Sequence, residues 1–467
     1  MIMSSMGRTL STKEDKSQYK KLIAIAIPMM VQNGISNFVN LLDNLMIGRV
    51  GGNALSGVAL ANQIMFVYFL MIFGATAGVG IFTAQYHGKG DNEGIRNTFR
   101  FKIVLNTILS AICTVVLLFS ARFLINLFLQ GEGDPADTAE ALDIGVRYMR
   151  IMLCSLIVSG LTQAYAGTLR DLGRTKAPMV ASVVAILVNL LGNTLLIYGY
   201  CGFPKLGADG AAIATVISRF VELAILIVYT GKHPTTFPFI VGAFKNIRLP
   251  RNLAKKLLFK ALPLMANETL WSLGMTMINQ CFSYRSYAAV EALSIQSTIW
   301  NLMSVTFMAM GEAVGIVMGH ILGAGELQVA KKRAVKMRWI TVLCAVVFGV
   351  LSIGISPFFP LLYKTGDDIR HLATGFIIIS SALMPLGAYN HASYFIIRSG
   401  GNAMITVIFD AVYTWCIAVP VAFVLSRFTG IGILYLFAIV QCLEVVKCFI
   451  AFLLVRSDMW IKNIVKE

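Results

Sequence analysis

Seven acidic residues lie inside, or at the ends of, long apolar segments of this chain. A carboxylate in such surroundings is costly, and by default it is a candidate for binding a proton or a metal cation. The chemistry that these residues offer is therefore reversible cation binding in an apolar environment. They are Asp43, Glu222, Glu268, Glu291, Glu312, Asp410 and Glu444.

Asp43 and two asparagines form the strongest pattern of this kind. Asp43 lies in the outer part of the segment 22–47, where Arg49 at the segment's end is the only base at helical spacing. Asn189 and Asn193 are four residues apart, so their amides share one face of a helix. Their oxygens can bind Na⁺ or hydrogen-bond to a carboxyl group, and hydrogen bonding between helices is the alternative role.

Two of the other acids have a base at helical spacing. Glu222 follows Arg219 by three residues, and Glu444 precedes Lys447 by three. Each acid is therefore expected to form an ion pair along its own helix. Self-neutralised pairs of this kind are typical of a structural role.

The composition indicates the environment of these acids. Of the 467 residues, 57% are hydrophobic and only 13% are charged, whereas soluble domains carry about 25% charged residues. These values exclude a soluble enzyme, a disordered chain and a fibrous protein, and they favour a polytopic membrane protein. The net charge of +16 is then explained by basic cytoplasmic loops rather than by nucleic-acid binding.

Twelve apolar runs are long enough to cross a bilayer as helices. Most of the 39 basic residues lie in the termini and the even-numbered connections, which predicts that both termini are cytoplasmic. We therefore expect a multi-pass protein of the inner (cytoplasmic) membrane, all-α and monomeric. The runs are 22–47, 55–81, 101–129, 143–168, 178–200, 209–230, 257–283, 290–318, 337–362, 372–397, 404–425 and 430–455.

The sequence also repeats itself. Ile27-Pro28-Met29-Met30 recurs as Leu262-Pro263-Leu264-Met265, 235 residues later, and further short matches follow in the same order. Six helices per half is an even number, so the two halves are parallel repeats, an arrangement suited to alternating access. A proline removes a helix hydrogen bond, so Pro28 is a candidate bend point. The expected parts are a cytoplasmic segment 1–21, an N-lobe 22–230, a cytoplasmic linker 231–256, a C-lobe 257–455 and a cytoplasmic tail 456–467.

Several motifs occur in a fixed order on these twelve runs. Pro28 precedes Asp43 by fifteen residues, the fourth run is followed by Thr168-Leu169-Arg170-Asp171-Leu172-Gly173-Arg174-Thr175-Lys176-Ala177-Pro178, and the tenth ends in Arg398-Ser399-Gly400-Gly401-Asn402. Together they resemble the multidrug and toxic compound extrusion (MATE) family over essentially the whole chain. The resemblance implies two six-helix lobes in a V around a central cleft. It also implies efflux of drug-like, often cationic, compounds in exchange for inward H⁺ or Na⁺.

The resemblance also implies a cation site in the N-lobe. Asp43 would be its acid, with Asn189 and Asn193 beside it, and Thr215 matches the family's remaining ligand. If the coupling ion is Na⁺, Asp43, Asn189 and Asn193 would be its metal ligands. Some members carry an aspartate where this chain has Asn193, so H⁺ and Na⁺ both remain open.

Glu268 and Asp410 are the candidates for a second site in the C-lobe. Glu268 matches a glutamate implicated in Na⁺-coupled relatives, which also carry an acid in the tenth helix. This chain has no carboxylate at the nearest positions there, so a hydrogen-bonded acid at the cavity wall is the alternative. Asp410 is expected to pair with Arg398 or with a base in a neighbouring loop.

Methionine, aromatic and amide side chains are suited to an adaptable substrate cavity. The chain has no P-loop, no HExxH and no catalytic cluster within a span, so we expect neither an enzyme nor a cofactor. The alternative transporter is a flippase for lipid-linked oligosaccharides, which would need cationic side chains in its cleft. The expected partners are the lipid bilayer and small organic substrates. The candidate cavity residues are Met29, Gln32, Asn33, Met65, Tyr68 and Gln296.

Overall fold

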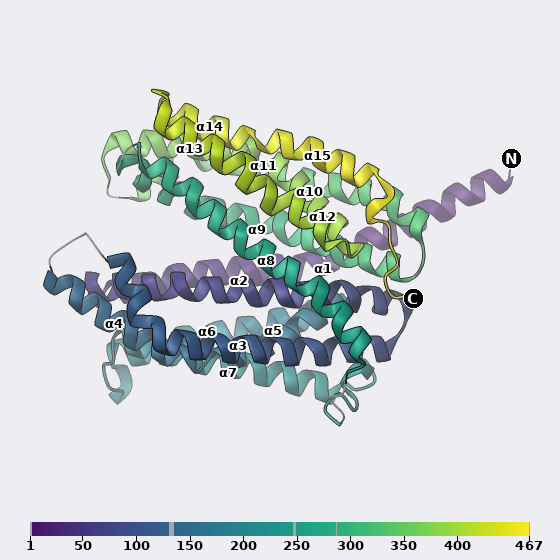
Figure 1. Ribbon diagram of the computed structural model, residues 1–467, viewed down its shortest axis with the longest axis horizontal. Coiled ribbons are helices and arrows are strands. Elements are labelled where there is room, and N and C mark those ends of the chain that lie inside the picture. Colours follow the sequence, from purple (N-terminus) through teal and green to yellow (C-terminus); the bar gives the residue numbers. More distant parts are fainter. Residues whose placement is uncertain (1, 130–134, 246–248, 286, 364, 467) are drawn as a thin grey trace. The chain divides into compact units, whose positions relative to one another are not determined.

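The computed structural model describes residues 2–129, 135–245, 249–285, 287–363 and 365–466, and these residues are almost wholly helical. None of them is in a strand, which confirms the all-α class. Figure 1 shows the helices along the chain. They are α1 (Ile2–Gly48), α2 (Gly52–Lys89), α3 (Asn92–Leu129), α4 (Pro135–Leu153), α5 (Leu156–Asp171), α6 (Lys176–Tyr198), α7 (Ala208–Lys232), α8 (Arg251–Ser283), α9 (Tyr287–Gly323), α10 (Leu327–Ile355), α11 (Asp367–Ser399), α12 (Ala403–Val407), α13 (Val419–Phe428), α14 (Ile433–Cys442) and α15 (Glu444–Arg456).

Shorter helical turns join or interrupt these elements. Two π-helical turns separate α12 from α13 within one span, and the remaining turns are 3₁₀ helices in connections. The predicted run 337–362 extends beyond the end of α10. The helix ends at Ile355 because Pro357 and Pro360, which follow it, cannot continue a helix. The turns are η1 (Tyr200–Gly202), η2 (Pro238–Ile240), η3 (Phe359–Leu362), η4 (Ile408–Val412), η5 (Thr414–Ala418) and η6 (Asp458–Trp460).

Each of the twelve predicted runs has a helical counterpart in chain order. Among the described residues, ten spans are long and apolar enough to cross a membrane, and the pair α4 and α5, bent by 51°, makes an eleventh. The seventh run is α8, which is not among these spans, because polar residues such as Asn267, Glu268, Asn279 and Gln280 interrupt it. The expected number of helices is therefore present, but α8 is markedly less apolar than its neighbours.

The chain forms two compact units that exchange short pieces. Unit 1 comprises Met1–Met30, Ala84–Asp91 and Ala266–Glu467, and unit 2 comprises Val31–Thr83 and Asn92–Met265. The lobes 22–230 and 257–455 follow the sequence repeat rather than these contacts, and they remain a prediction. The V-shaped arrangement around a central cleft also remains a prediction.

Three helices pass from one unit to the other. The helix α2 does so between Thr83 and Ala84, and α1 and α8 do so at equivalent points of the repeat. The boundary in α1 lies between Met30 and Val31, and the boundary in α8 lies between Met265 and Ala266. Each of these two boundaries follows a proline within the helix by two residues, Pro28 in α1 and Pro263 in α8. Because proline lacks the N–H that would complete the helix ladder, both helices are weakened where they change units.

Each unit has its own apolar core. In unit 1, α11 packs against α9, α10 and α15, and Figure 1 shows α15 running beside α11. In unit 2, α6 packs against α7, and α3 packs against α4 and α5. The core of unit 2 includes Met65, Tyr68 and Met149, each at most 3% exposed.

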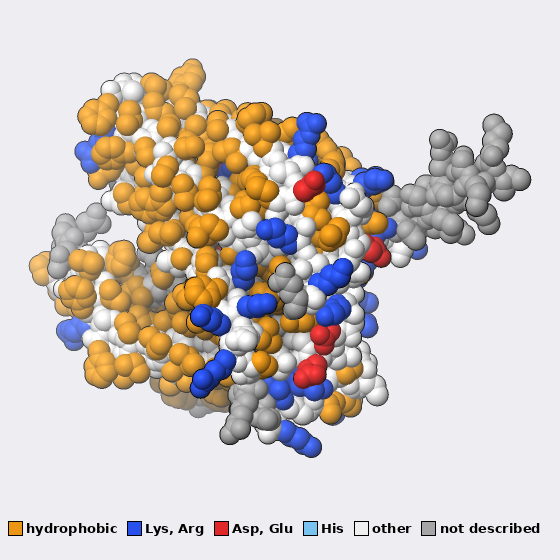
Figure 2. Space-filling model, turned by 45° about the vertical axis from the view of Figure 1, so that its right-hand side comes forward, with side chains coloured by type: hydrophobic (Ala, Val, Ile, Leu, Met, Phe, Trp, Pro, Cys, Tyr) orange, Lys and Arg blue, Asp and Glu red, His pale blue; other side chains and the backbone are white. Residues whose placement is uncertain are grey.

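Large hydrophobic side chains remain exposed on the outside of the helices. Phe119 and Phe123 of α3 are 83% and 69% exposed. Figure 2 shows hydrophobic side chains over much of the face in view, while Lys and Arg gather toward its right-hand side. Exposed apolar surface of this extent is expected where helices face lipid rather than water.

Within unit 1, the last residues of the chain are held by the end of α2. The Gln85 side chain donates to the backbone oxygens of Ser399 (2.9 Å) and Lys462 (3.1 Å), and it accepts from the backbone N–H of Ile464 at 2.9 Å. Gln85 is fully buried, as is the tail residue Trp460 at 1% exposed. The tail predicted at 456–467 is therefore an ordered part of unit 1 up to residue 466.

The close crossing of α2 and α9 gives a prediction about stability. A Cβ added at Gly323 would lie 2.0 Å from the backbone oxygen of Gln85, so Gly323→Ala must push the helices apart. We expect a loss of about 1–3 kcal/mol, visible as earlier thermal unfolding in detergent. The matched control is Gly354→Ala in α10, which meets nothing within 4 Å. Equal melting temperatures for the two variants would contradict the crossing.

Candidate functional site

The predicted acid and amides of unit 2 lie together. Asn193 of α6 donates from Nδ2 to Asp43 Oδ1 of α1 at 2.7 Å, and the same nitrogen lies 3.3 Å from Asn189 Oδ1. Asn189 Nδ2 in turn donates to Thr215 Oγ1 of α7 at 3.1 Å. The one-turn spacing on α6 and the packing of α6 against α7 therefore place all four predicted residues in one chain of hydrogen bonds.

The electrostatic setting of Asp43 distinguishes it from other embedded acids. Asp43 is half-buried, and among the described residues it has no ion-pair partner. The nearby base on α7, Arg219, pairs instead with Glu222 at 3.0 Å, which confirms the ion pair expected from their spacing. Asp43 is therefore contacted by a neutral amide, while the charge of Arg219 acts on it from nearby without an ion pair among the described residues.

The donor set around Asp43 can hold a small cation. It offers carboxylate, amide and hydroxyl oxygens, the ligands that hard cations such as Na⁺ prefer. Asn193 is 1% exposed, and its Oδ1 has no hydrogen-bond partner, so one buried acceptor is still to be satisfied. A proton on Asp43 would equally be held by this hydrogen-bond chain. No group of three or more His, Cys, Asp or Glu side chains in the described part of the chain could hold a metal, so any metal here would depend on the amides.

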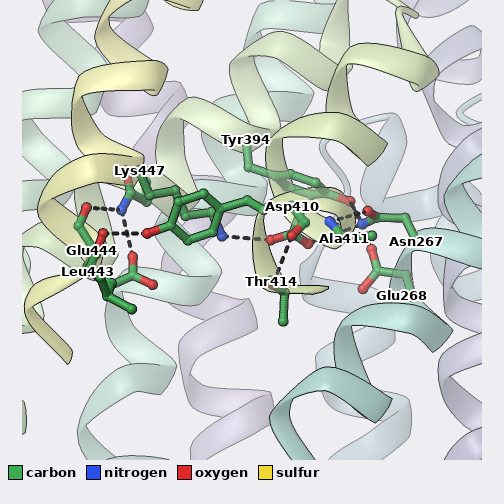
Figure 3. A network of polar contacts seen from close by, with 11 residues as sticks. Asn267, Glu268, Tyr394, Asp410, Ala411, Thr414, Leu443, Glu444 and Lys447 are labelled. Atoms are coloured by element: carbon green, nitrogen blue, oxygen red, sulfur yellow. Dashed lines mark hydrogen bonds and ion pairs between the residues drawn. The ribbon is translucent and has the colours of Figure 1, made fainter. Parts of the chain in front are cut away.

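Unit 1 contains a second polar network, shown in Figure 3. Tyr394 of α11 donates from its hydroxyl to Glu268 Oε1 of α8 at 3.0 Å. Asn267, which is fully buried, donates to Asp410 Oδ2 at 3.1 Å and lies 3.3 Å from the Tyr394 hydroxyl. The two second-lobe candidates, Glu268 and Asp410, thus belong to one network bridged by Asn267.

The ion pairs of this network differ from those that sequence spacing predicts. Lys447 Nζ lies 2.7 Å from Asp410 Oδ1, so Lys447 pairs across helices and not with Glu444 on its own helix. Arg398, the expected partner of Asp410, lies 3.8 Å from Glu268 Oε1 instead. Spacing alone failed because a long side chain reaches several neighbours, and packing between helices decides which one it contacts.

Glu444 has a neutral partner. Its Oε2 accepts a hydrogen bond of 2.6 Å from Asn390 Nδ2 of α11, the same nitrogen that donates to the Glu444 backbone oxygen at 3.0 Å. Sequence reasoning missed Asn267, Tyr394 and Lys447 as members of the network. The positions of Asn267 beside Glu268, and of Tyr394 one turn before Arg398, were the signals available for two of them.

The predicted cavity residues occupy varied surroundings. Met29 lies in the apolar core of unit 1, and Met65 and Tyr68 lie in the core of unit 2. The Tyr68 hydroxyl is fixed by Ser110 Oγ (2.9 Å) and the backbone oxygen of Leu156 (2.7 Å). The amides are more varied in exposure, since Gln296 is buried, Gln32 is half-buried and Asn33 is exposed. Their role in binding substrate remains a prediction.

A helical membrane protein with an internal repeat and embedded polar sites has an architecture that many transporters share. The family model MatE matches this chain twice, over residues 28–195 and 263–424. The chain therefore belongs to the MatE family. The two matches begin at Pro28 and Pro263, the prolines that the internal repeat aligns.

Similar proteins extend over nearly the whole chain. A "Probable multidrug resistance protein YoeA" of Bacillus subtilis is 24% identical, covering 90% of each chain. A "Probable multidrug resistance protein NorM" of Thermotoga maritima is also 24% identical, covering 92% of this chain and 90% of that protein. A crystal structure of a MATE protein in complex with MaL6 superimposes with a TM-score of 0.85 at 19% identity, covering 95% of this chain and 96% of that one. The fold is thus that of MATE transporters, and the protein is a multi-pass integral membrane transporter.

Proposed function

We propose that this protein exports drug-like, often cationic, organic compounds in exchange for inward H⁺ or Na⁺ by alternating access. The observation that carries the proposal is an embedded carboxylate, Asp43, which accepts a hydrogen bond from a neutral amide and has no ion pair within the described part of the chain. Such a group can gain and lose a small cation, whereas a carboxylate locked to a base cannot. The multidrug resistance names of the relatives support the substrate class.

In this proposal Asp43 couples the ion to a change of conformation. A cation or proton neutralises the carboxylate, and Asn193, Asn189 and Thr215 adjust their hydrogen bonds around it. The neutral and charged states favour different arrangements of α1, with Pro28, two residues before the helix changes units, as the proposed bend point. If cation and drug favour opposite conformations, each weakens the binding of the other by the same factor.

The setting of the transporter follows from the charge distribution. The excess of Lys and Arg in the termini and even-numbered connections supports an inner-membrane protein with both termini in the cytoplasm. We propose that it works as a monomer, without a cofactor and without enzymatic chemistry. One charge that crosses about 100 mV releases about 2.3 kcal/mol, so an ion gradient can drive the cycle.

The test is transport by purified protein in proteoliposomes. Uptake or release of ethidium, or of a norfloxacin-type compound, is followed while a pH gradient and a Na⁺ gradient are imposed one at a time. We expect one of the two gradients to drive accumulation against a substrate gradient, and the matching ionophore to abolish it. Substrate flux that is indifferent to both gradients would refute the exchange mechanism.

A further inference from the structure

The embedded acids of the two units are neutralised in different ways. In unit 2, Asp43 accepts a hydrogen bond from a neutral amide. In unit 1, Asp410 contacts the ammonium group of Lys447 at 2.7 Å, and their side chains are only 14% and 10% exposed. A buried carboxylate with a built-in ammonium has little need of an ion from solution.

The local structure around Asp410 encloses this ammonium group. Asp410 lies in the π-helical turn η4, and such turns are frequent at functional sites. The same region of the chain places the ring of Phe409 at 5.1 Å and the ring of Tyr413 at 5.6 Å from Lys447 Nζ. A carboxylate and two aromatic faces together make a cation site, and the side chain of Lys447 occupies it.

The rest of Asp410 is also fixed. Asn267 Nδ2 donates to its second carboxylate oxygen, and Asn267 Oδ1 accepts from the backbone N–H of Ala411 at 3.2 Å. The Thr414 hydroxyl donates to the backbone oxygen of Asp410 at 2.8 Å. Figure 3 shows Asn267 and Thr414 beside Asp410. Both carboxylate oxygens therefore have partners before any external ion arrives.

Other charged and titratable groups surround the pair. Glu268 of α8 has Arg398 at 3.8 Å, so it too lies beside a base of the protein. Further titratable groups face this network from the helices packed around it. They are Tyr394 and His391 of α11, Glu312 of α9, Tyr413 of the π-helical region, and Glu444 and Cys448 of α15.

From this arrangement we propose that Lys447 is a tethered counter-cation, which permanently fills the cation position at Asp410. Unit 1 consequently takes up no coupling ion at Asp410, so the exchange cycle uses the site at Asp43 without a second ion at Asp410. Lys447 is thus a positioning residue that sets the number of ions per transport cycle. The inference rests on the proposed exchange function. Whether Lys447 occupies the cation position at Asp410 can, however, be tested without measuring transport.

The test measures ion-dependent thermal stability of the full chain in detergent. The background is Asp43→Asn, which removes the first site. In this background Tm is compared between NaCl and choline chloride, and between acid and neutral buffer. We expect neither difference in Tm to depend on Asp410. Adding Lys447→Met empties the second site, and we expect Na⁺ or protons now to raise Tm by about 3 °C or more when the site is saturated.

Adding Asp410→Asn as a third change removes the carboxylate, and we expect it to abolish the new ion response. This readout separates a filled cation site from a merely structural ion pair, because loss of a structural pair lowers Tm without creating ion dependence. If adding Lys447→Met leaves the dependence of Tm on Na⁺ and protons unchanged, the proposal is overturned. If the Lys447→Met protein does not fold, the Asp43→Asn protein decides alone: ion-dependent stabilisation that disappears on Asp410→Asn overturns the proposal, and its absence supports it.

Failure of this inference is distinguishable from failure of the proposed function. Gradient-driven transport with two ions per substrate, one depending on Asp410, would refute the tethered cation and leave the exchanger intact. Absence of ion-driven transport, together with a new ion-dependent change of Tm in the Lys447→Met protein, would refute the exchanger and leave the tethered cation intact.

Discussion

Asp43→Asn abolishes gradient-driven efflux and leaves folding intact, if the proposed mechanism holds. Asparagine has nearly the same shape, and its side-chain oxygen can still accept the 2.7 Å hydrogen bond from Asn193. It cannot be ionised, however, so it neither exchanges a proton nor attracts a cation at the membrane interior. Transport in proteoliposomes should fall to the level of protein-free vesicles, while the yield and the melting temperature stay near those of the unmodified chain.

The matched control removes another embedded acid of the same unit. The pair Arg219 and Glu222 lies on α7 with its charged groups 3.0 Å apart. The double variant Arg219→Met, Glu222→Gln removes both charges together, so no unpaired charge is left behind. We expect it to retain ion-driven transport, with an altered ion dependence because the charge of Arg219 also acts on Asp43. Efflux at the normal rate by the Asp43→Asn protein would eliminate Asp43 as the coupling site.

The largest effect on stability is expected at Lys102 of α3. Its side chain is fully buried, and Nζ lies 2.6 Å from Asp171 Oδ2 and 3.3 Å from Thr168 Oγ1. Lys102→Met leaves the carboxylate of Asp171 without this ammonium in a setting that is 17% exposed. Breaking a buried pair in this way typically costs about 3–5 kcal/mol.

Thermal unfolding in detergent measures the effect. We expect Lys102→Met to melt well below the unmodified chain, and the double variant Lys102→Met, Asp171→Asn to recover much of the loss, because the carboxylate charge is removed together with the ammonium. The control is Lys205→Met, an exposed lysine in the connection before α7, with an expected change within about 0.5 kcal/mol. A Lys102→Met protein as stable as the Lys205→Met protein would show that the buried pair contributes little.

Much of the architecture was accessible from local patterns. The apolar runs predicted the helices, since each helix must span the thickness of a bilayer. The offset of 235 residues between Pro28 and Pro263 indicated the repeat. The candidate site at Asp43 was partly accessible, because two asparagines four residues apart must share a helix face, while its assignment as a cation site came from family resemblance. Thr215 came from family resemblance, and the packing of α6 on α7 places it beside Asn189.

Other features depended on contacts between helices distant in sequence. Periodicity tells which face of a helix is apolar but not which helix it meets, so the change of units within α1 and α8 had no signature beyond the prolines. The same limit applies to charge. Lys447 is three residues from Glu444, yet its ammonium group lies beside Asp410, which the π-helical turn η4 presents to it from another helix. The identity and spacing of residues thus settled the helices and the repeat and indicated a candidate cation site, while the partner of each long charged side chain was settled by packing, because several partners lie within its reach.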